Sequence, residues 1–102
     1  LVMNVKIQAV QFTADQKLLD LIEKKVQKFE QLYDRITSVE VHLKLDNQST
    51  QVKDKVVSIK CNIPGTQLYA EDTSKLFEDG IDTTVASIKR QLKKYKEKMR
   101  AN

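Results

Sequence analysis

Two spacings of apolar residues alternate along this chain, and their order restricts the possible folds more than any other feature. From Met3 to Ala9 every second residue is apolar, as in a strand with one buried face. From Leu18 to Tyr33 the apolar residues recur every three or four positions, which is typical of a helix with one buried face. Thr13 and Gln16 match a T-x-x-Q capping box at the start of that helix. The chain is therefore predicted to begin with a strand and a long helix.

The alternating spacing returns in the middle of the chain. It runs over residues 39–45 and again over residues 57–63, so both segments are predicted to be strands. The polar segment between them, residues 46–55, is predicted to be a loop at a hairpin tip. Pro64 and Gly65 predict a turn that leads into a fourth strand over residues 66–71.

The helical spacing returns from Phe77 to Met99, so a second long helix is predicted there, with Asp72 or Thr73 as its N-cap. The order β-α-β-β-β-α predicts an α+β fold, in which the first two strands are parallel and the rest of the sheet is an antiparallel meander. Each helix has one apolar face, so both are expected on one face of a four-stranded mixed sheet. The prediction is a two-layer sandwich that forms a single domain over residues 1–102.

Few residues in this chain are suited to catalysis or metal binding. Cys61 is the single cysteine and His42 the single histidine. Cys61 is predicted to face the core and His42 the solvent, so neither an activated nucleophile nor a metal site is expected. We therefore expect no enzyme, no cofactor and no small-molecule substrate. The lone cysteine favours a cytoplasmic location, and without a run of about 18–20 apolar residues no membrane span is expected.

Charge is distributed unevenly along the second predicted helix. Residues 71–82 carry a net charge of −4, and residues 87–100 carry +6. The helix dipole accounts for acids near the start of a helix and for bases in its last turn only, whereas the basic segment covers about three turns. Its basic residues are Lys89, Arg90, Lys93, Lys94, Lys96, Lys98 and Arg100.

The first predicted helix carries a similar basic flank. Lys17, Lys24 and Lys28 fall on one side of its apolar face, with Lys25 close to them. If the two helices lie side by side, their basic rows border a shared groove suited to a polyanion backbone. On charge alone, a lysine-rich face that only contacts solvent fits equally well.

With these elements in place, the chain resembles a known family. The segments that carry the resemblance are MNVKI from residue 3, KFEQLYDRI from residue 28, the pair Ile81-Asp82, and RQLKKYK from residue 90. They are similar to segments of the short ribosome hibernation-promoting factors, the family that includes ribosome-associated inhibitor A. The resemblance covers nearly the whole chain and includes the β-α-β-β-β-α order.

The resemblance implies a protein that binds 16S rRNA of the small ribosomal subunit, and the 70S ribosome, in the channel used by mRNA and tRNA. Such factors keep ribosomes inactive under stress and catalyse nothing. The resemblance assigns the rRNA contacts to Lys24, Lys25, Lys28 and the seven basic residues between positions 89 and 100. The charge pattern adds Lys17. A basic module that docks on an acidic protein is the alternative.

Two departures from the family pattern bear on these expectations. Many members carry an acid-Met-Tyr run before the Ile-Asp pair, where this chain has Leu76-Phe77-Glu78, so a contact from that tyrosine is not carried over. Long members add a second domain that pairs ribosomes, and we do not expect residues 1–102 to encode it. Leu1 and Val2 precede the family-like start at Met3.

Overall fold

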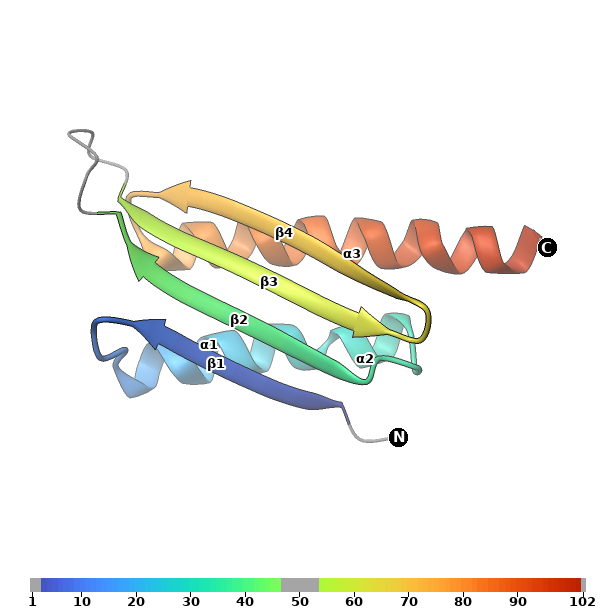
Figure 1. Cartoon of the computed structure of the whole chain (residues 1–102), viewed down its shortest axis with the longest axis horizontal. Coiled ribbons are helices and arrows are strands. Elements are labelled where there is room, and N and C mark those ends of the chain that lie inside the picture. The colour runs from blue at the N-terminus through green and yellow to red at the C-terminus, as the bar shows by residue number, and fades with distance from the viewer. Residues whose placement is uncertain (1–2, 47–53, 102) are drawn as a thin grey trace.

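The computed structural model describes residues 3–46 and 54–101, and its elements follow the predicted order (Figure 1). They are β1 (Asn4–Val10), α1 (Gln16–Gln27), α2 (Phe29–Leu32), β2 (Ser38–Leu45), β3 (Lys55–Ile63), β4 (Thr66–Ser74) and α3 (Phe77–Ala101). Leu1, Val2 and most of the loop predicted over residues 46–55 lie outside the described residues. The predicted α+β class is confirmed.

The four strands form one sheet in the order β1-β2-β3-β4. β1 pairs with β2 in parallel, and the two other neighbouring pairs are antiparallel, as predicted. The register brings Val41, Ile59 and Ala70 into one row across the sheet, and all three are buried. Gly65 adopts a φ of +86° in the turn between β3 and β4, a conformation that glycine reaches without strain.

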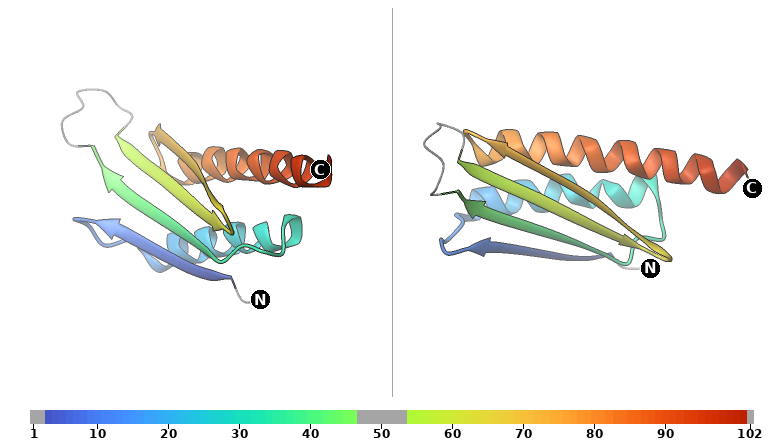
Figure 2. Two further views of the ribbon diagram at one scale, coloured as in Figure 1. Left: turned by 45° about the vertical axis from the view of Figure 1, so that its right-hand side comes forward. Right: turned by 45° about the horizontal axis from the view of Figure 1, so that its top comes forward.

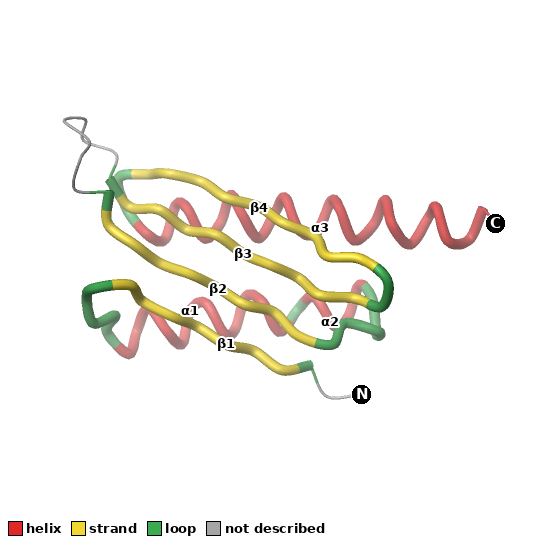
Figure 3. Tube along the Cα trace, viewed as in Figure 1, coloured by secondary structure: helices red, strands yellow, loops and turns green. Residues whose placement is uncertain are grey.

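Both long helices cover the same face of the sheet, which gives the predicted two-layer sandwich (Figures 2 and 3). The core between the layers takes its largest fully buried side chains from every layer: Ile22, Val26 and Phe29 from the first helical segment, Val39, Val41, Leu43, Val57 and Ile59 from the sheet, Ile81, Ile88 and Leu92 from α3, and Ile36 from the α2–β2 connection. The alternating and helical spacings therefore identified all of these residues except Ile36, which lies outside both patterns.

The predicted capping box at Thr13 is wrong. α1 starts at Gln16, and its N-cap is Asp15, whose Oδ1 accepts a hydrogen bond from the backbone N–H of Leu18 at 2.8 Å. Asp and Thr are both good N-caps, but Asp is the better of the two and places a negative charge at the positive end of the helix dipole. Thr13 lies two residues before the cap and is exposed.

The first helix is shorter than predicted and is interrupted. α1 ends at Gln27, and a short α2 follows from Phe29. The backbone N–H of Gln31 bonds to the carbonyl oxygen of Lys28 at 3.1 Å, an i to i+3 bond that tightens the helix locally. The apolar spacing continues through the interruption because Val26 and Phe29 are both fully buried.

The second predicted helix begins later than expected. Asp72 and Thr73 were its expected N-caps, but both lie in β4, where they pair with Val57 and Val56 of β3. Pairing with the long strand β3 continues to Ser74, so the strand hydrogen bonds override the local capping preference. Accordingly Glu71 and Asp72 belong to the sheet, and α3 starts at Phe77.

The far end of α3 extends beyond the sheet (Figure 1). Ile88 and Leu92 are fully buried and Tyr95 is partly buried, whereas Met99 is 53% exposed. The helical spacing also placed Met99 on the apolar face expected to pack against the sheet, and that part of the prediction is wrong. The helical spacing continues past the last strand residue that the helix can cover.

Candidate nucleic-acid interface

An ion pair between α1 and α3 shows which flanks of the two helices face each other. Lys25 Nζ lies 2.7 Å from Asp82 Oδ1. At about 100° per residue, Lys17, Lys24 and Lys28 lie on the same flank of the first helix as Lys25. On α3, the flank of Asp82 continues through the following four residues: Lys89, Lys93, Lys96 and Arg100. These two basic rows therefore border one valley between the helices.

The opposite flank of α3 is turned toward the edge strand β4. Gln91 Nε2 donates a hydrogen bond to the carbonyl oxygen of Tyr69 at 2.9 Å. Near the start of α3, Gly80 lies so close to the sheet that a Cβ there would be 2.9 Å from Val57 Cγ2. Contacts on both flanks thus fix the orientation of α3 about its own axis. The basic row that begins at Lys89 therefore stays on the side that faces α1.

The predicted rRNA-binding residues do not all lie in the valley. Of the eleven, Lys25, Lys89 and Lys96 are half-buried and the other eight are exposed. The helical geometry places Arg90, Lys94 and Lys98 on the back of α3 or toward β4. The structure therefore brings the two flanking rows together and leaves these three residues on a separate surface.

The two basic rows are staggered along the valley. α1 and α3 run in the same direction (Figure 1). Measured from the Lys25–Asp82 pair, Lys17 lies about 12 Å back along α1, and Arg100 lies about 27 Å forward along α3. The rows therefore form one strip about 39 Å long that crosses from α1 to α3, in a molecule whose longest extent is 47 Å.

Because of the stagger, acidic residues lie across the valley from each basic row. Glu78 and Asp82 occupy the flank of α3 that faces the lysines of α1. At the other end, Lys96 shares a small cleft with Glu30 and Asp34, which follow α1 along the chain. Near the start of the valley, α1 is therefore basic and α3 acidic. Near its other end, α3 is basic and the chain that follows α1 is acidic.

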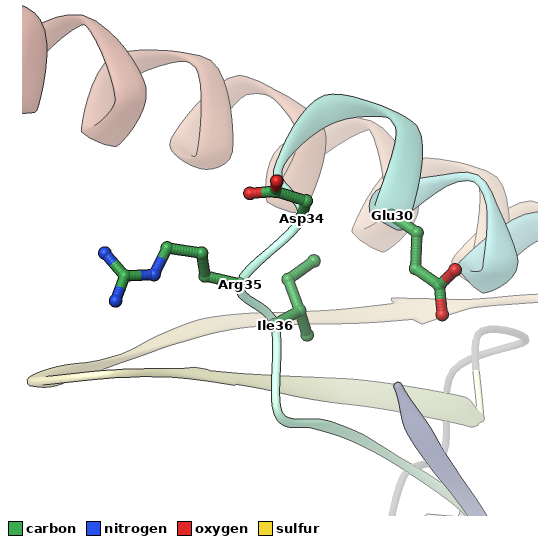
Figure 4. A pocket seen from close by; sticks show the side chains of 4 residues that line it. All are labelled: Glu30, Asp34, Arg35 and Ile36. Atoms are coloured by element: carbon green, nitrogen blue, oxygen red, sulfur yellow. The ribbon is translucent and has the colours of Figure 1, made fainter. Parts of the chain in front are cut away.

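A second, adjoining cleft of about 380 Å³ opens at the end of α2 and contains a basic residue that sequence reasoning missed. Glu30, Asp34, Arg35 and Ile36 line it. Figure 4 shows the Arg35 side chain extending away from Glu30. Arg35 is exposed, and its planar guanidinium group is suited to binding phosphate. It lies within the KFEQLYDRI segment, which is the signal that could have identified it.

Two aromatic contacts join the helices to their surroundings. Tyr33 and Tyr95 meet edge to face with ring centroids 5.7 Å apart, so Tyr95 closes the end of the core. Phe12 and Phe77 are stacked with centroids 5.2 Å apart and an interplanar angle of 8°. Phe77, which precedes the Ile-Asp pair of α3, therefore packs against the β1–α1 connection.

Cys61 and the possible metal ligands bear on the prediction that this chain has no activated nucleophile and no metal site. Cys61 is fully buried, and burial raises the pKa of its thiol to about 12, which disfavours the reactive thiolate. Within residues 3–46 and 54–101, no three His, Cys, Asp or Glu side chains are grouped so as to hold a metal ion. Nor does any helix of this described part have the length and apolar character needed to cross a membrane.

Known proteins with related sequences include two ribosome hibernation promoting factors. The factor of Pseudomonas putida KT2440 is 29% identical over 99 residues, which cover 97% of this chain and 92% of the relative. The factor of Azotobacter vinelandii is 30% identical over 96 residues, covering 94% and 85%.

Two solved structures show the same fold. A ribosomal subunit interface protein from Coxiella burnetii superposes with a TM-score of 0.80 at 22% identity, over 93% of this chain and 99% of that chain. The N-terminal domain of Protein Y from Thermus thermophilus gives a TM-score of 0.77 at 22% identity, over 91% and 99%.

The family model for the sigma 54 modulation protein and S30EA ribosomal protein matches residues 5–100. This match reaches every predicted strand and helix and omits only the first two residues of the first predicted strand. The chain therefore belongs to the sigma 54 modulation protein/S30EA ribosomal protein family.

Proposed function

We propose that this protein is a ribosome hibernation factor that binds 16S rRNA of the small subunit in the decoding channel used by mRNA and tRNA. By occupying that channel, alone or in the 70S ribosome, it keeps ribosomes inactive under stress. It acts by binding in the cytoplasm, without catalysis, and residues 1–102 form its ribosome-binding domain.

One observation carries the proposal: two helices on the same face of the sheet present a basic strip about 39 Å long. The strip contains Lys17, Lys24 and Lys28 of the first helix and Lys89, Lys93, Lys96 and Arg100 of α3. Neutralising several phosphates at once releases condensed counterions, which favours binding to a polyanion. The names of the relatives, ribosome hibernation promoting factors, identify the ribosome as the polyanion to test.

The form of the strip also bears on how RNA is recognised. Its charges lie on α-helices, whose regular geometry sets the spacing of the backbone positions that carry them. Structured RNA is recognised mainly by its shape and backbone, and phosphate contacts position a protein without reading sequence. We expect binding to depend on the fold of the rRNA and only weakly on its base sequence.

A sucrose gradient of ribosomes with added protein tests the proposal. We expect the protein to migrate with the 30S and 70S fractions in moderate salt and to be released as the salt concentration rises, because the contacts are mainly to phosphates. Protein that stays at the top of the gradient would contradict the proposal.

Competition distinguishes RNA binding from docking on an acidic ribosomal protein. Purified 16S rRNA added to the protein–30S complex should displace the protein from the subunit if the RNA itself is the ligand. If a large excess of rRNA leaves the complex intact, the basic strip binds an acidic protein instead. Salt dependence alone does not separate these two cases, since both interactions are electrostatic.

A further inference from the structure

Two adjacent lysines of α1 differ in whether they already have an anionic partner. Lys25 Nζ lies 2.7 Å from Asp82 Oδ1, and the Lys25 side chain is 33% exposed. Lys24 is exposed, and no carboxylate oxygen of the described residues lies within 4 Å of its Nζ. Sequence reasoning grouped these two lysines together, but only Lys24 is free to bind a phosphate.

Asp82 occupies the position where the basic strip crosses from α1 to α3. Its carboxylate contacts Lys25 as an oxygen of an RNA phosphate would. Glu78, one turn earlier on the same flank, adds a second negative charge beside α1. A phosphate that approaches Lys25 must therefore compete with Asp82 for the ammonium group and come close to two acids.

We propose that Asp82 is a specificity-determining residue that withholds Lys25 from RNA and interrupts the basic strip at the helix crossing. This inference rests on the proposed function and identifies the class of RNA that the strip accepts. A flexible single strand follows a continuous line of positive charge, so the interruption weakens its binding. A folded RNA presents phosphates at fixed points and keeps its contacts on both sides of Asp82.

The substitution Asp82→Asn tests the inference, because it removes the charge and keeps the shape of a side chain that is 60% exposed. The probe for a flexible strand is a polyuridylate oligomer, and the probe for folded RNA is the 30S subunit. We expect affinity for polyuridylate to rise several-fold. The slope of log affinity against log salt should steepen by about 0.7, as expected for one additional lysine–phosphate contact on a single strand. Affinity for 30S subunits should change much less.

Two matched variants separate this effect from a change in net charge. Asp79→Asn removes the same charge from an exposed position on the outer side of α3, away from Lys25, and should leave the salt slope unchanged. The double variant Lys25→Met, Asp82→Asn removes the lysine that Asp82 releases, and its affinity for polyuridylate should return to that of the wild-type protein.

Equal gains from Asp82→Asn and Asp79→Asn would overturn the inference, since net charge would then explain them. The inference would also be overturned if Asp82→Asn did not raise the affinity for polyuridylate, or if it raised the affinity for 30S subunits by the same factor. The polyuridylate measurements need no ribosome. If the wild-type protein fails to bind 30S subunits, the proposed function falls, while the Asp82 and Asp79 variants still decide whether Lys25 is withheld from phosphates.

Discussion

Helices α1 and α3 lie on the same sheet face, yet they use their length differently. In α1 the apolar face is buried from Leu18 to Val26, so nearly every turn contributes to the core. α3 has 25 residues, but its fully buried residues end at Leu92. α3 therefore continues for more than two turns beyond its last fully buried residue. These last turns carry five of the seven basic residues that lie between positions 89 and 100.

This difference separates the residues that hold the fold from those available for binding. On α1 the lysines lie on the flank of a helix that the core immobilises. On α3 the basic residues begin beside buried positions and continue onto a projecting end (Figure 2). Substitutions in α1 should therefore affect both stability and binding. Substitutions at the projecting end of α3 should affect binding with little change in stability.

The largest expected effect tests where the packed part of α3 ends. Leu92 and Met99 lie on the same apolar face, but Leu92 is fully buried and Met99 is 53% exposed. Leu92→Ala should lower the free energy of unfolding by about 2–5 kcal/mol. Met99→Ala should change it by less than about 0.5 kcal/mol. Urea denaturation measures both, and similar losses would show that the end of α3 packs as tightly as its middle.

A smaller effect tests how closely the start of α3 approaches the sheet. In an exposed helix, Gly→Ala stabilises by about 1 kcal/mol. At Gly80 the added Cβ would lie 2.9 Å from Val57 Cγ2, and overpacking costs about 1–3 kcal/mol, so Gly80→Ala should lower stability. In a Val57→Ala background the same change should become neutral or stabilising. A stabilised Gly80→Ala single variant would contradict the close contact.

The third effect tests how α1 begins. Asp15 Oδ1 accepts the hydrogen bond from the Leu18 N–H, so Asp15→Ala should lower the free energy of unfolding by about 1 kcal/mol. Thr13→Ala is the matched control and should change it by only a few tenths. If the two losses are reversed in thermal or urea denaturation, the capping box at Thr13 and Gln16 is the true start of the helix.

Most of the fold could be predicted because the apolar spacing records which faces are buried. Met3 through Ala9, the two middle strands and the faces of both helices follow this rule. The errors lie at element ends, where local preference competes with tertiary contacts. Thr73 is a good N-cap in isolation, but pairing with Val56 keeps it in β4. Met99 keeps the helical spacing although no strand lies opposite it.

The candidate site was only partly predictable for a related reason. The sequence identifies the flank on which a lysine lies, but not its partner on another element. The pairing of Lys25 with Asp82 depends on the stagger between α1 and α3, which packing against the sheet determines. Arg35 was missed because it lies outside both helices. Its role and those of the eleven predicted residues remain predictions.

The central claim, that the helix side of the protein binds the small ribosomal subunit, is tested most directly by two matched charge reversals. One changes Lys89, Lys93 and Lys96 in the valley to glutamate. The other changes Lys6, Lys44 and Lys60, on the opposite face of the sheet, to glutamate.

The two variants have the same net charge, and thermal denaturation verifies that both are folded. In co-sedimentation with 30S subunits in moderate salt, we predict that the valley variant no longer binds and the sheet-face variant still does. Retained binding by the valley variant, or an equal loss in both, would contradict this account.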